Sequence, residues 1–512
     1  MIRRVRVRFA PSPTGPLHMG GVRTALYNYL FAKKHDGDFI LRIEDTDQNR
    51  YVKGAENYIS ESLKWCGITP DEGQGYGGQY GPYRQSERKE SGIYRKYAEQ
   101  LLANGKAYYA FDTAEELEQM REDLKKAGVA APQYNAISRE RMQNSLSLPA
   151  EEVNRRLANG DPYVIRIKMP RNEEIKFKDM VRGWVVVHSS NLDDKVLFKA
   201  DGMPTYHLAN IVDDYAMNIT HVIRGEEWLP SAPLHVYLYE AFGWQDQRPD
   251  FAHLPLLLKP DGNGKLSKRD GDRLGFPVFP LQWQDPSSDE ISSGYREKGY
   301  FPEAFINILA LLGWNPGTNQ EIFSLEELVQ AFSIERVGKA GAKYDPEKAL
   351  WFNQQYLRSK DNFELADQLL HNELHKTLLG EKDREFVSGV CALMKERATF
   401  LYEIPLEGSY LFQRPTDYDE KTHRKKWKEG SASIMQEWLE VLKEVESFTA
   451  VEIEDSFKAF LEAKSLGIGR VLPLFRLIVT GKGMGPSMFA IAALLGKKEC
   501  IERMEIGLKR LN

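Results

Sequence analysis

Hydrophobic and polar positions change their period several times within the first hundred residues. Apolar side chains alternate with arginines over 5–9, which is the period of a β-strand. After a proline-rich break at 11–16, apolar residues recur at helical spacing over 18–37, and the run 39–43 is typical of a buried strand. A second helical pattern covers 86–104. Strand, helix, strand, helix at this spacing predicts an α/β fold with a right-handed, parallel, doubly wound sheet.

Residues from about 106 to 200 look like an insertion into this pattern. They contain a charged helical stretch at 114–127 and two strand-like runs. The alternation then resumes, with strands expected at 205–210 and 219–223 and an apolar helix around 233–242. Beyond residue 300 the pattern is almost wholly helical, with runs at 303–312, 324–332, 363–379 and 431–446.

Composition narrows the class of protein. The chain has 512 residues, enough for about three to four domains. Its 69 Lys and Arg against 74 Asp and Glu give a formal net charge of −5, which excludes a polybasic nucleic-acid binder but allows a local basic face. No stretch reaches the ~18 apolar residues of a membrane span. The distant cysteines Cys66, Cys391 and Cys500, and a basic start with no apolar run after it, predict a cytosolic protein with reduced thiols.

The turn after the first strand is the first candidate for chemistry. It runs from Thr14 to Gly21 and leads into the first helix, whose N-terminus attracts phosphate through unpaired N–H groups and the helix dipole. Gly20 and Gly21 would let a flat ligand approach the backbone, and His18 could donate to a phosphate oxygen. The alternative is a tight turn with a helix-capping histidine.

Three further segments carry charged or aromatic groups. The stretch 265–269 (KLSKR) places three cations on a glycine-rich loop, which suits a negative charge that grows in a transition state, although a solvated basic loop is the alternative. The stretch 42–47 (RIEDTD) follows a strand, where open α/β sheets bind ligands, or is a solvated acidic turn. The segments 204–210 and 221–228 bring aromatic, amide and guanidinium groups together, or belong to the core and its rim.

The order and spacing of these motifs resemble those of class I aminoacyl-tRNA synthetases. More specifically, RFAPSPTG at 8–15, RIEDTD at 42–47, YHLAN at 206–210 and GYFPEA at 299–304 resemble the bacterial-type glutamyl-tRNA synthetase family. The resemblance runs over nearly the whole chain. It implies an enzyme that makes glutamyl-adenylate from L-glutamate and ATP, with Mg²⁺ bound to the ATP, and transfers glutamate to the terminal adenosine of tRNA(Glu).

The resemblance also assigns site residues. The catalytic group is His18, Gly20, Lys265 and Lys268. ATP binding adds Thr14, Gly21 and Ser267. Glutamate binding falls to Arg8, Ser12, Glu44, Tyr206, Asn210 and Arg224, which supply the guanidinium groups for a carboxylate and the anion for an amine that such a substrate needs.

This sequence departs from the family pattern in several places. Gly21 replaces the second histidine of the His-x-Gly-His turn, and Arg269 replaces the final serine of the second signature. The stretch 109–113 has no cysteine where some relatives hold zinc, so no metal site is predicted there. An insertion at 277–294 has no counterpart in the family pattern, and we expect it to decorate the surface.

The resemblance divides the chain into five parts. They are a Rossmann-type catalytic domain in two pieces (1–105 and 201–259), an inserted acceptor-stem domain (106–200), a stem-contact domain (260–345) and a helical anticodon-binding domain (346–512). Arg397 falls near a position linked to anticodon reading, and a monomer is expected. The alternatives are a glutaminyl-tRNA synthetase, disfavoured by the helical C-terminal half, a shorter glutamyl transferase, and an inactive tRNA-binding paralogue.

Overall fold

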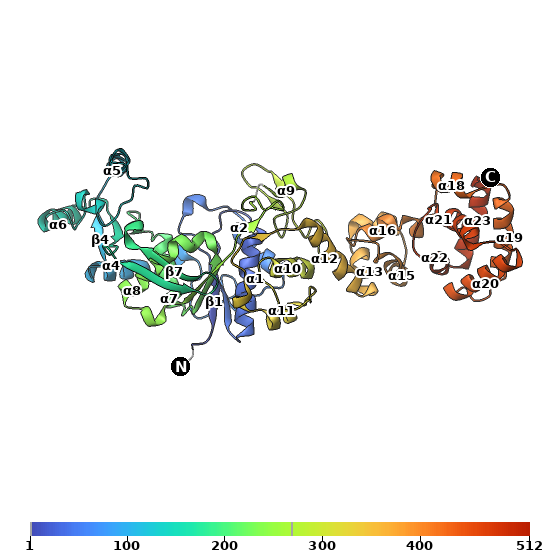
Figure 1. The fold of residues 1–512 in the computed structure, drawn as a ribbon, viewed down its shortest axis with the longest axis horizontal. Coiled ribbons are helices and arrows are strands. Elements are labelled where there is room, and N and C mark those ends of the chain that lie inside the picture. Colours follow the sequence, from blue (N-terminus) through green and yellow to red (C-terminus); the bar gives the residue numbers. More distant parts are fainter. Residues whose placement is uncertain (1–2, 268–269, 512) are drawn as a thin grey trace. The chain divides into compact units, whose positions relative to one another are not determined.

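The computed structural model describes residues 3–267 and 270–511, and these form two units. The first, the α/β unit, comprises the chain up to residue 298 together with 302–346. The second, the helical unit, comprises 299–301 and the chain from 347 onward. Figure 1 shows strands and helices in the first unit and a succession of helices in the second. An α/β half followed by an all-α half is therefore confirmed.

Parallel strands dominate the α/β unit. The pairs β1–β2, β2–β3, β9–β10 and β6–β10 are parallel, and β6 and β7 form an antiparallel hairpin. Thr220 N donates to Arg6 O at 2.9 Å, which brings β9 beside β1. The strands are β1 (Arg6–Phe9), β2 (Asp38–Leu41), β3 (Glu72–Gly73), β6 (Glu174–Asp179), β7 (Gly183–His188), β9 (His221–Gly225) and β10 (Asp250–Leu254).

Smaller sheets complete this unit. The inserted region has the antiparallel sheet β4 (Ala107–Ala110), β5 (Val164–Ile167) and β8 (Val196–Phe198). Two-stranded pairs join β11 (Leu257–Leu258) to β14 (Ala342–Lys343) and β12 (Trp283–Gln284) to β13 (Ile291–Ser292). The helices are α1 (Met19–Lys34), α2 (Ala55–Trp65), α3 (Gln85–Lys89), α4 (Ile93–Ala103), α5 (Ala114–Lys126), α6 (Ala150–Asn159), α7 (Tyr206–Ala216), α8 (Ala232–Phe242), α9 (Gly271–Leu274), α10 (Pro302–Leu311) and α11 (Leu325–Ala331).

Two elements differ from the sequence prediction. The helix expected over 86–104 is two helices, because Gly92 adopts a φ of +72° between α3 and α4. The strand expected at 205–210 is the first turn of α7, with Thr205 as its N-cap. A short apolar run has the same composition in a buried strand and a buried helix, so its period alone did not decide between them.

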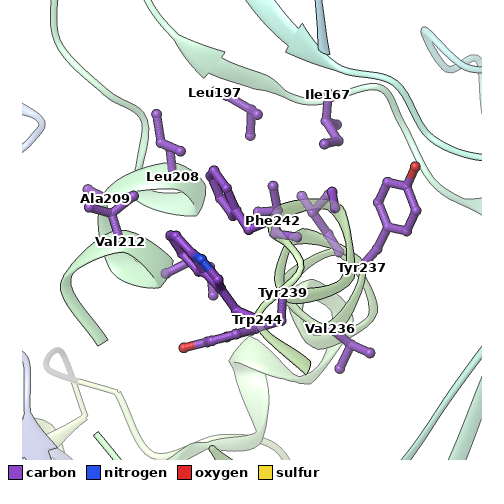
Figure 2. Close-up of a cluster of buried hydrophobic side chains, with 14 of the residues drawn as sticks. Ile167, Leu197, Leu208, Ala209, Val212, Val236, Tyr237, Tyr239, Phe242 and Trp244 are labelled. Carbon is purple, nitrogen blue, oxygen red and sulfur yellow. The ribbon is translucent and has the colours of Figure 1, made fainter. Parts of the chain in front are cut away.

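The hairpin β6–β7 and the hydrophobic core both cross the expected edge of the insertion. The hairpin lies within 106–200, yet β6 pairs with β10. Figure 2 shows side chains of the inserted sheet, such as Leu197, facing the aromatic rings of Phe242 and Trp244. Trp244 stacks on Phe242 with ring centroids 4.1 Å apart. One continuous core therefore fixes the insertion to α7 and α8.

The helical unit is built on aromatic packing. Trp438 is fully buried, with its ring centroid 4.8 Å from that of Phe457 and 5.6 Å from that of Phe475. Among the described residues, no helix is long and apolar enough to cross a membrane. The helices of the helical unit are α12 (Pro346–Ser359), α13 (Asn362–Leu370), α14 (Lys376–Leu379), α15 (Arg384–Met394), α16 (Glu403–Glu407), α17 (Ser409–Phe412), α18 (Glu420–Lys426), α19 (Ser431–Glu444), α20 (Ala450–Ala463), α21 (Ile468–Thr480), α22 (Met488–Leu495) and α23 (Lys497–Leu511).

Candidate active site

A cavity of about 400 Å³ opens at the carboxyl ends of β1, β2 and β9 in the α/β unit. Open α/β sheets bind their ligands at this edge. The structure brings ten of the predicted residues together there, although they come from four separate segments of the chain. They are Arg8, Ser12, Thr14, His18, Gly20, Gly21, Glu44, Tyr206, Asn210 and Arg224.

His18 caps the helix that it precedes. Its Nδ1 accepts a hydrogen bond from the backbone N–H of Gly20 at 3.1 Å, so the proton of the neutral ring is on Nε2. His18 also lines the cavity. Capping and ligand binding are therefore compatible, because the cap fixes the tautomer and leaves Nε2 as the ring's donor.

The helix terminus itself differs from the expectation of unpaired N–H groups. Met19 N donates to Val278 O at 2.8 Å, Gly20 N donates to His18 Nδ1 and Gly21 N donates to His18 O at 2.8 Å, so the first three N–H groups of α1 are already engaged. A Cβ on Gly21 would lie 2.5 Å from Leu17 Cδ1. A larger residue at Gly21 would therefore require the side chain of Leu17 to move.

The prediction that the insertion at 277–294 only decorates the surface is wrong, because part of the insertion is buried. Its residues Val278, Phe279, Leu281 and Trp283 are buried. The ring of Phe279 meets that of His18 edge-on at 6.2 Å. The insertion therefore covers the N-terminus of α1, while its hairpin tip around residues 285–291 is exposed.

A buried cluster of charges forms one side of the cavity. Asp214 on α7 accepts from Arg8 Nε at 3.0 Å and lies 2.8 Å from Arg42 Nη1. Burial opposes ionisation of Asp214, but Arg8 and Arg42 hold its pKa below the usual range. Glu44 accepts through the same oxygen, Oε1, from Arg42 and from Asn210, each at 3.0 Å, which leaves Oε2 for a ligand. Burial raises the pKa of Glu44, against the lowering effect of Arg42.

Arg224 has a different kind of environment. Its Nε donates to His253 Nε2 at 3.0 Å, and Nη1 donates to Tyr206 Oη at 2.9 Å and lies 3.3 Å from His235 Nδ1. Its Nη2 donates to the carbonyl oxygen of Trp228 at 3.3 Å. None of these four partners is a carboxylate. Burial lowers the pKa of Arg224, yet a guanidinium keeps its proton in proteins, so this is a desolvated cation with neutral partners.

These contacts leave the cavity with an excess of positive charge. Three buried guanidinium groups, those of Arg8, Arg42 and Arg224, face two carboxylates, those of Glu44 and Asp214. The other charged side chains of the lining have partners outside this cluster. They are Arg50, paired with Asp47, and Glu227, paired with Lys265. The cluster is therefore suited to an anionic ligand.

The described part of the KLSKR loop, 265–267, is not among the lining residues of the cavity. Lys265 is exposed, and its Nζ is 3.1 Å from Glu227 Oε1. Ser267 donates through its N–H and its hydroxyl to Asp270 Oδ2, at 2.8 and 2.6 Å, and Lys259 lies 3.2 Å from the same carboxylate. The hydrogen bonds from Ser267 are the main cause of a lowered pKa of Asp270, and Lys259 lowers it further.

Lys268 and Arg269, the end of this loop, lie outside the described residues. The predicted role of Lys268 therefore stays a prediction.

Sequence reasoning assigned no individual role to three groups that the structure pairs with predicted site residues. Asp214 and Arg42 form the charge cluster, and Asp270 holds the loop. Arg42 stands in the RIEDTD motif, and its position directly beside a buried strand could have indicated it. Asp214 follows Asp213 on a helix with no local signal, because its two arginine partners are 172 and 206 positions away in the sequence.

Two predicted features are not among the lining residues of the cavity. Asp112, in the stretch without cysteine, accepts hydrogen bonds from Tyr134 Oη and the backbone N–H of Gln143. Within 3–267 and 270–511, no three His, Cys, Asp or Glu side chains are grouped so as to hold a metal ion. Arg397 belongs to the helical unit and donates to the carbonyl oxygen of Gly485 at 3.1 Å.

Comparisons with known proteins agree with this geometry. Residues 4–351 match the family of class I tRNA synthetases (E and Q), catalytic domain, and residues 364–508 match an anticodon binding domain. The chain is 56% identical to the glutamate–tRNA ligase of Amoebophilus asiaticus over 509 residues, covering 99% of each protein. It is 58% identical to that of Bacteroides fragilis over 504 residues, covering 98% of each.

Solved structures extend the agreement to the whole fold. A glutamate tRNA ligase from Elizabethkingia meningosepticum, in complex with its amino acid, superposes with a TM-score of 0.93 at 51% identity and full coverage of both chains. The glutamate-tRNA synthetase of Elizabethkingia anophelis gives a TM-score of 0.89 at 51% identity, covering 99% of this chain and 100% of that one. The chain belongs to the glutamate–tRNA ligase family of class I aminoacyl-tRNA synthetases.

Proposed function

We propose that this chain activates L-glutamate with ATP to glutamyl-adenylate and transfers the glutamyl group to the 3′-terminal adenosine of tRNA(Glu). The observation that carries the proposal is the excess of one positive charge in the cluster of buried side chains beside the cavity, which consists of Arg8, Arg42, Arg224, Glu44 and Asp214. Glutamate carries two carboxylates and one ammonium group near neutral pH, so its net charge of about −1 complements this cluster. Membership of the family supplies the reaction class.

The contacts suggest how glutamate would be held. Arg224 and Tyr206 would receive a carboxylate, because the guanidinium has no carboxylate among its four protein partners. Glu44 would accept from the substrate ammonium group through Oε2. Glutamine offers a neutral amide in place of the side-chain carboxylate, and binding it would leave the buried cation of Arg224 underpaired. Arg8, Ser12 and Asn210 complete the lining.

ATP would occupy the part of the cavity formed by the turn at 14–21. An oxygen of the substrate carboxylate attacks the α-phosphorus and pyrophosphate leaves, so the protein's work is to align the groups and stabilise charge. His18 can donate from Nε2, and Lys265 and Lys268 would stabilise the departing phosphates. Lys265 must exchange Glu227 for phosphate to do so.

Mg²⁺ would arrive with ATP and be held mainly by phosphate oxygens. The carboxylates of the cavity lining are Glu44 and Glu227, and each is already engaged by a cationic side chain. The lining therefore fits a metal ion carried by the nucleotide better than a metal held by the protein alone.

The helical unit would bind the anticodon arm, and the region 106–200 the acceptor stem. The match of 364–508 to an anticodon binding domain supports the first assignment. Basic side chains on α18, at 421–426, are exposed or half-exposed and could contact the tRNA backbone. Arg397 would act near the last anticodon base. We further propose that the enzyme acts as a cytosolic monomer.

Aminoacylation with radiolabelled glutamate on purified tRNA(Glu) tests the proposal. The wild-type protein should charge this tRNA with glutamate and not with glutamine. Arg224→Ala should raise the KM for glutamate by about 100-fold and the KM for ATP by no more than a few-fold, because one charge-assisted contact to the amino acid is lost. Arg95→Ala, which removes an exposed arginine paired with Glu99, is the matched control.

Equal increases in both KM values for Arg224→Ala would remove Arg224 from the amino-acid site. No charging by the wild-type protein would favour an inactive tRNA-binding paralogue.

A further inference from the structure

Arg224 is one end of a buried chain of side chains that ends on a different part of the sheet. Arg224 stands on β9, and its Nε donates to His253 on β10 at 3.0 Å. His253 Nδ1 lies 2.6 Å from Oδ2 of Asp179, the last residue of β6. All three side chains are buried. Arg224 donates to one nitrogen of the imidazole and Asp179 faces the other. Only one protonation state of the imidazole satisfies both neighbours.

That state follows from the donors and acceptors. Arg224 can only donate, so His253 Nε2 must present its lone pair. The ring proton of the neutral imidazole is then on Nδ1 and is donated to Asp179. Burial lowers the pKa of His253, which favours the neutral ring despite the nearby carboxylate.

Asp179 is itself fixed by the backbone. Its Oδ1 accepts from the N–H groups of Val181 at 3.0 Å and Arg182 at 2.8 Å, in the turn between β6 and β7. Oδ2 is thereby aimed at His253. The hairpin that crosses the expected boundary of the insertion thus supplies the anchor of the chain.

A second branch completes the environment of the guanidinium. Nη1 faces His235 Nδ1 at 3.3 Å, and His235 Nε2 lies 3.2 Å from His207 Nδ1. Burial lowers the pKa of His235 well below its usual value, so this partner too is neutral. Four of the five N–H groups of Arg224 are committed to neutral acceptors, and one on Nη2 is left for a ligand.

We propose that Asp179 and His253 are positioning residues that hold the guanidinium of Arg224 through an uncharged acceptor and thereby select an amino acid with a carboxylate side chain. The inference rests on the proposed function of the cavity. Arg8 shows the contrast, because its direct pairing with Asp214 places a carboxylate on the guanidinium itself. The imidazole keeps the charge of Asp179 one ring away from Arg224, so the cation stays available for the substrate.

Asp179→Asn tests the tautomer directly. The N–H groups of Val181 and Arg182 require an oxygen at the Oδ1 position, so the new amide must turn its NH₂ toward His253. The ring proton then moves to Nε2, where it faces the Nε–H of Arg224, and the guanidinium is displaced. We expect the KM for glutamate to rise by about 10- to 100-fold with the KM for ATP within two-fold, and the preference for glutamate over glutamine to fall.

The double variant separates a positioning role from a structural one. In His253→Leu the Nε–H of Arg224 loses its acceptor whatever stands at residue 179, so the KM for glutamate should rise by about 10- to 100-fold, as in Asp179→Asn. Adding Asp179→Asn to His253→Leu should then raise the KM for glutamate by less than a further three-fold. If the two substitutions multiply instead, Asp179 does not act through the histidine and the proposal is wrong.

Two further measurements guard against misfolding. ¹⁵N chemical shifts of the imidazole nitrogens, assigned by loss of the signals in His253→Leu, should show Nδ1 protonated in the wild type and Nε2 protonated in Asp179→Asn. Asp194→Asn is the matched control, because Asp194 is equally buried and accepts from Tyr108 at 2.6 Å and Arg139 at 3.0 Å, in another network. It should lower the thermal midpoint without changing the KM for glutamate by more than two-fold.

The outcomes distinguish this inference from the function on which it rests. Wild-type charging with an unchanged KM for glutamate in Asp179→Asn would overturn the positioning role alone. An absence of glutamate charging by the wild type would overturn the proposed function instead. A wild-type ring protonated on Nε2 would contradict the inference whatever the kinetics.

Discussion

The two units bury different kinds of side chain. The α/β unit encloses many ionisable groups, among them the cluster around Asp214 and the chain through His253. In the helical unit, the described residues that are both buried and of the types Asp, Glu, Lys, Arg or His are His375 and Arg503, while Trp438 and the rings around it fill the core.

This difference indicates that the α/β unit gives up some stability in order to form its ligand-binding cavity. Burying an ion pair gains little or nothing over packed apolar groups, whereas removing one partner leaves an uncompensated charge at high cost. A fold that needed only to be stable would therefore be built like the core of the helical unit. The α/β unit retains buried charges beside its cavity, where a charged substrate can complete them. The two cores should consequently respond to substitution in different ways.

Asp214→Asn should have the largest effect. It leaves the buried guanidinium groups of Arg8 and Arg42 without their shared carboxylate, at a cost of about 3–5 kcal/mol in the free energy of unfolding. Urea denaturation measures the loss, and the KM for glutamate should rise in the same protein. Asp367→Asn, which breaks an exposed pair with Arg384 in the helical unit, should leave both quantities almost unchanged. If Asp214→Asn changed neither the free energy of unfolding nor the KM for glutamate, the charge cluster would contribute neither to stability nor to glutamate binding.

Trp438→Ala should be nearly as destabilising but catalytically silent. Truncating a fully buried indole among aromatic rings costs about 3–5 kcal/mol. Because this core lies in the unit without the cavity, the KM values for glutamate and ATP at low temperature should stay within two-fold of the wild type. Trp351→Ala, at an exposed position on α12, is the control for loss of a tryptophan. A marked rise in the KM for glutamate would weaken the contrast between the units.

The smallest expected effect is on pH dependence. Burial lowers the pKa of His207 to about 4, from about 6.5 in an unfolded chain. The unfolded state therefore takes up a proton that the folded state refuses, and stability falls as the pH drops from about 6.5 toward 4. His207→Gln should make the thermal midpoint depend less on pH in that window. It should not remove the dependence, because burial also lowers the pKa of His235 and His253.

The exposed His371 of the helical unit provides the control for this measurement. His371→Gln should leave the dependence of the thermal midpoint on pH as it is in the wild type. An unchanged slope in His207→Gln would mean that folding does not lower the pKa of His207.

Local patterns were enough for much of the architecture and for the lining of the cavity. The strand at 5–9, the helix that follows His18 and the long helical second half were all predicted from period and breakers. The motifs also indicated the residues that line the cavity, because segments that end parallel strands meet at one edge of the sheet. Resemblance to a known family added the chemistry.

The sequence by itself thus determined which groups were available and which strand ends carried them. Only the tertiary structure decided how they are paired. Asp214 joins Arg8 across 206 positions of sequence, and Asp179 reaches Arg224 through a histidine on a third strand. Whether a buried guanidinium meets a carboxylate or an imidazole depends on which distant segments pack together, and that choice decides which arginine keeps its charge for the substrate. No periodicity along the chain records it, because hydrogen bonding acts over about 3 Å in space and not along the sequence.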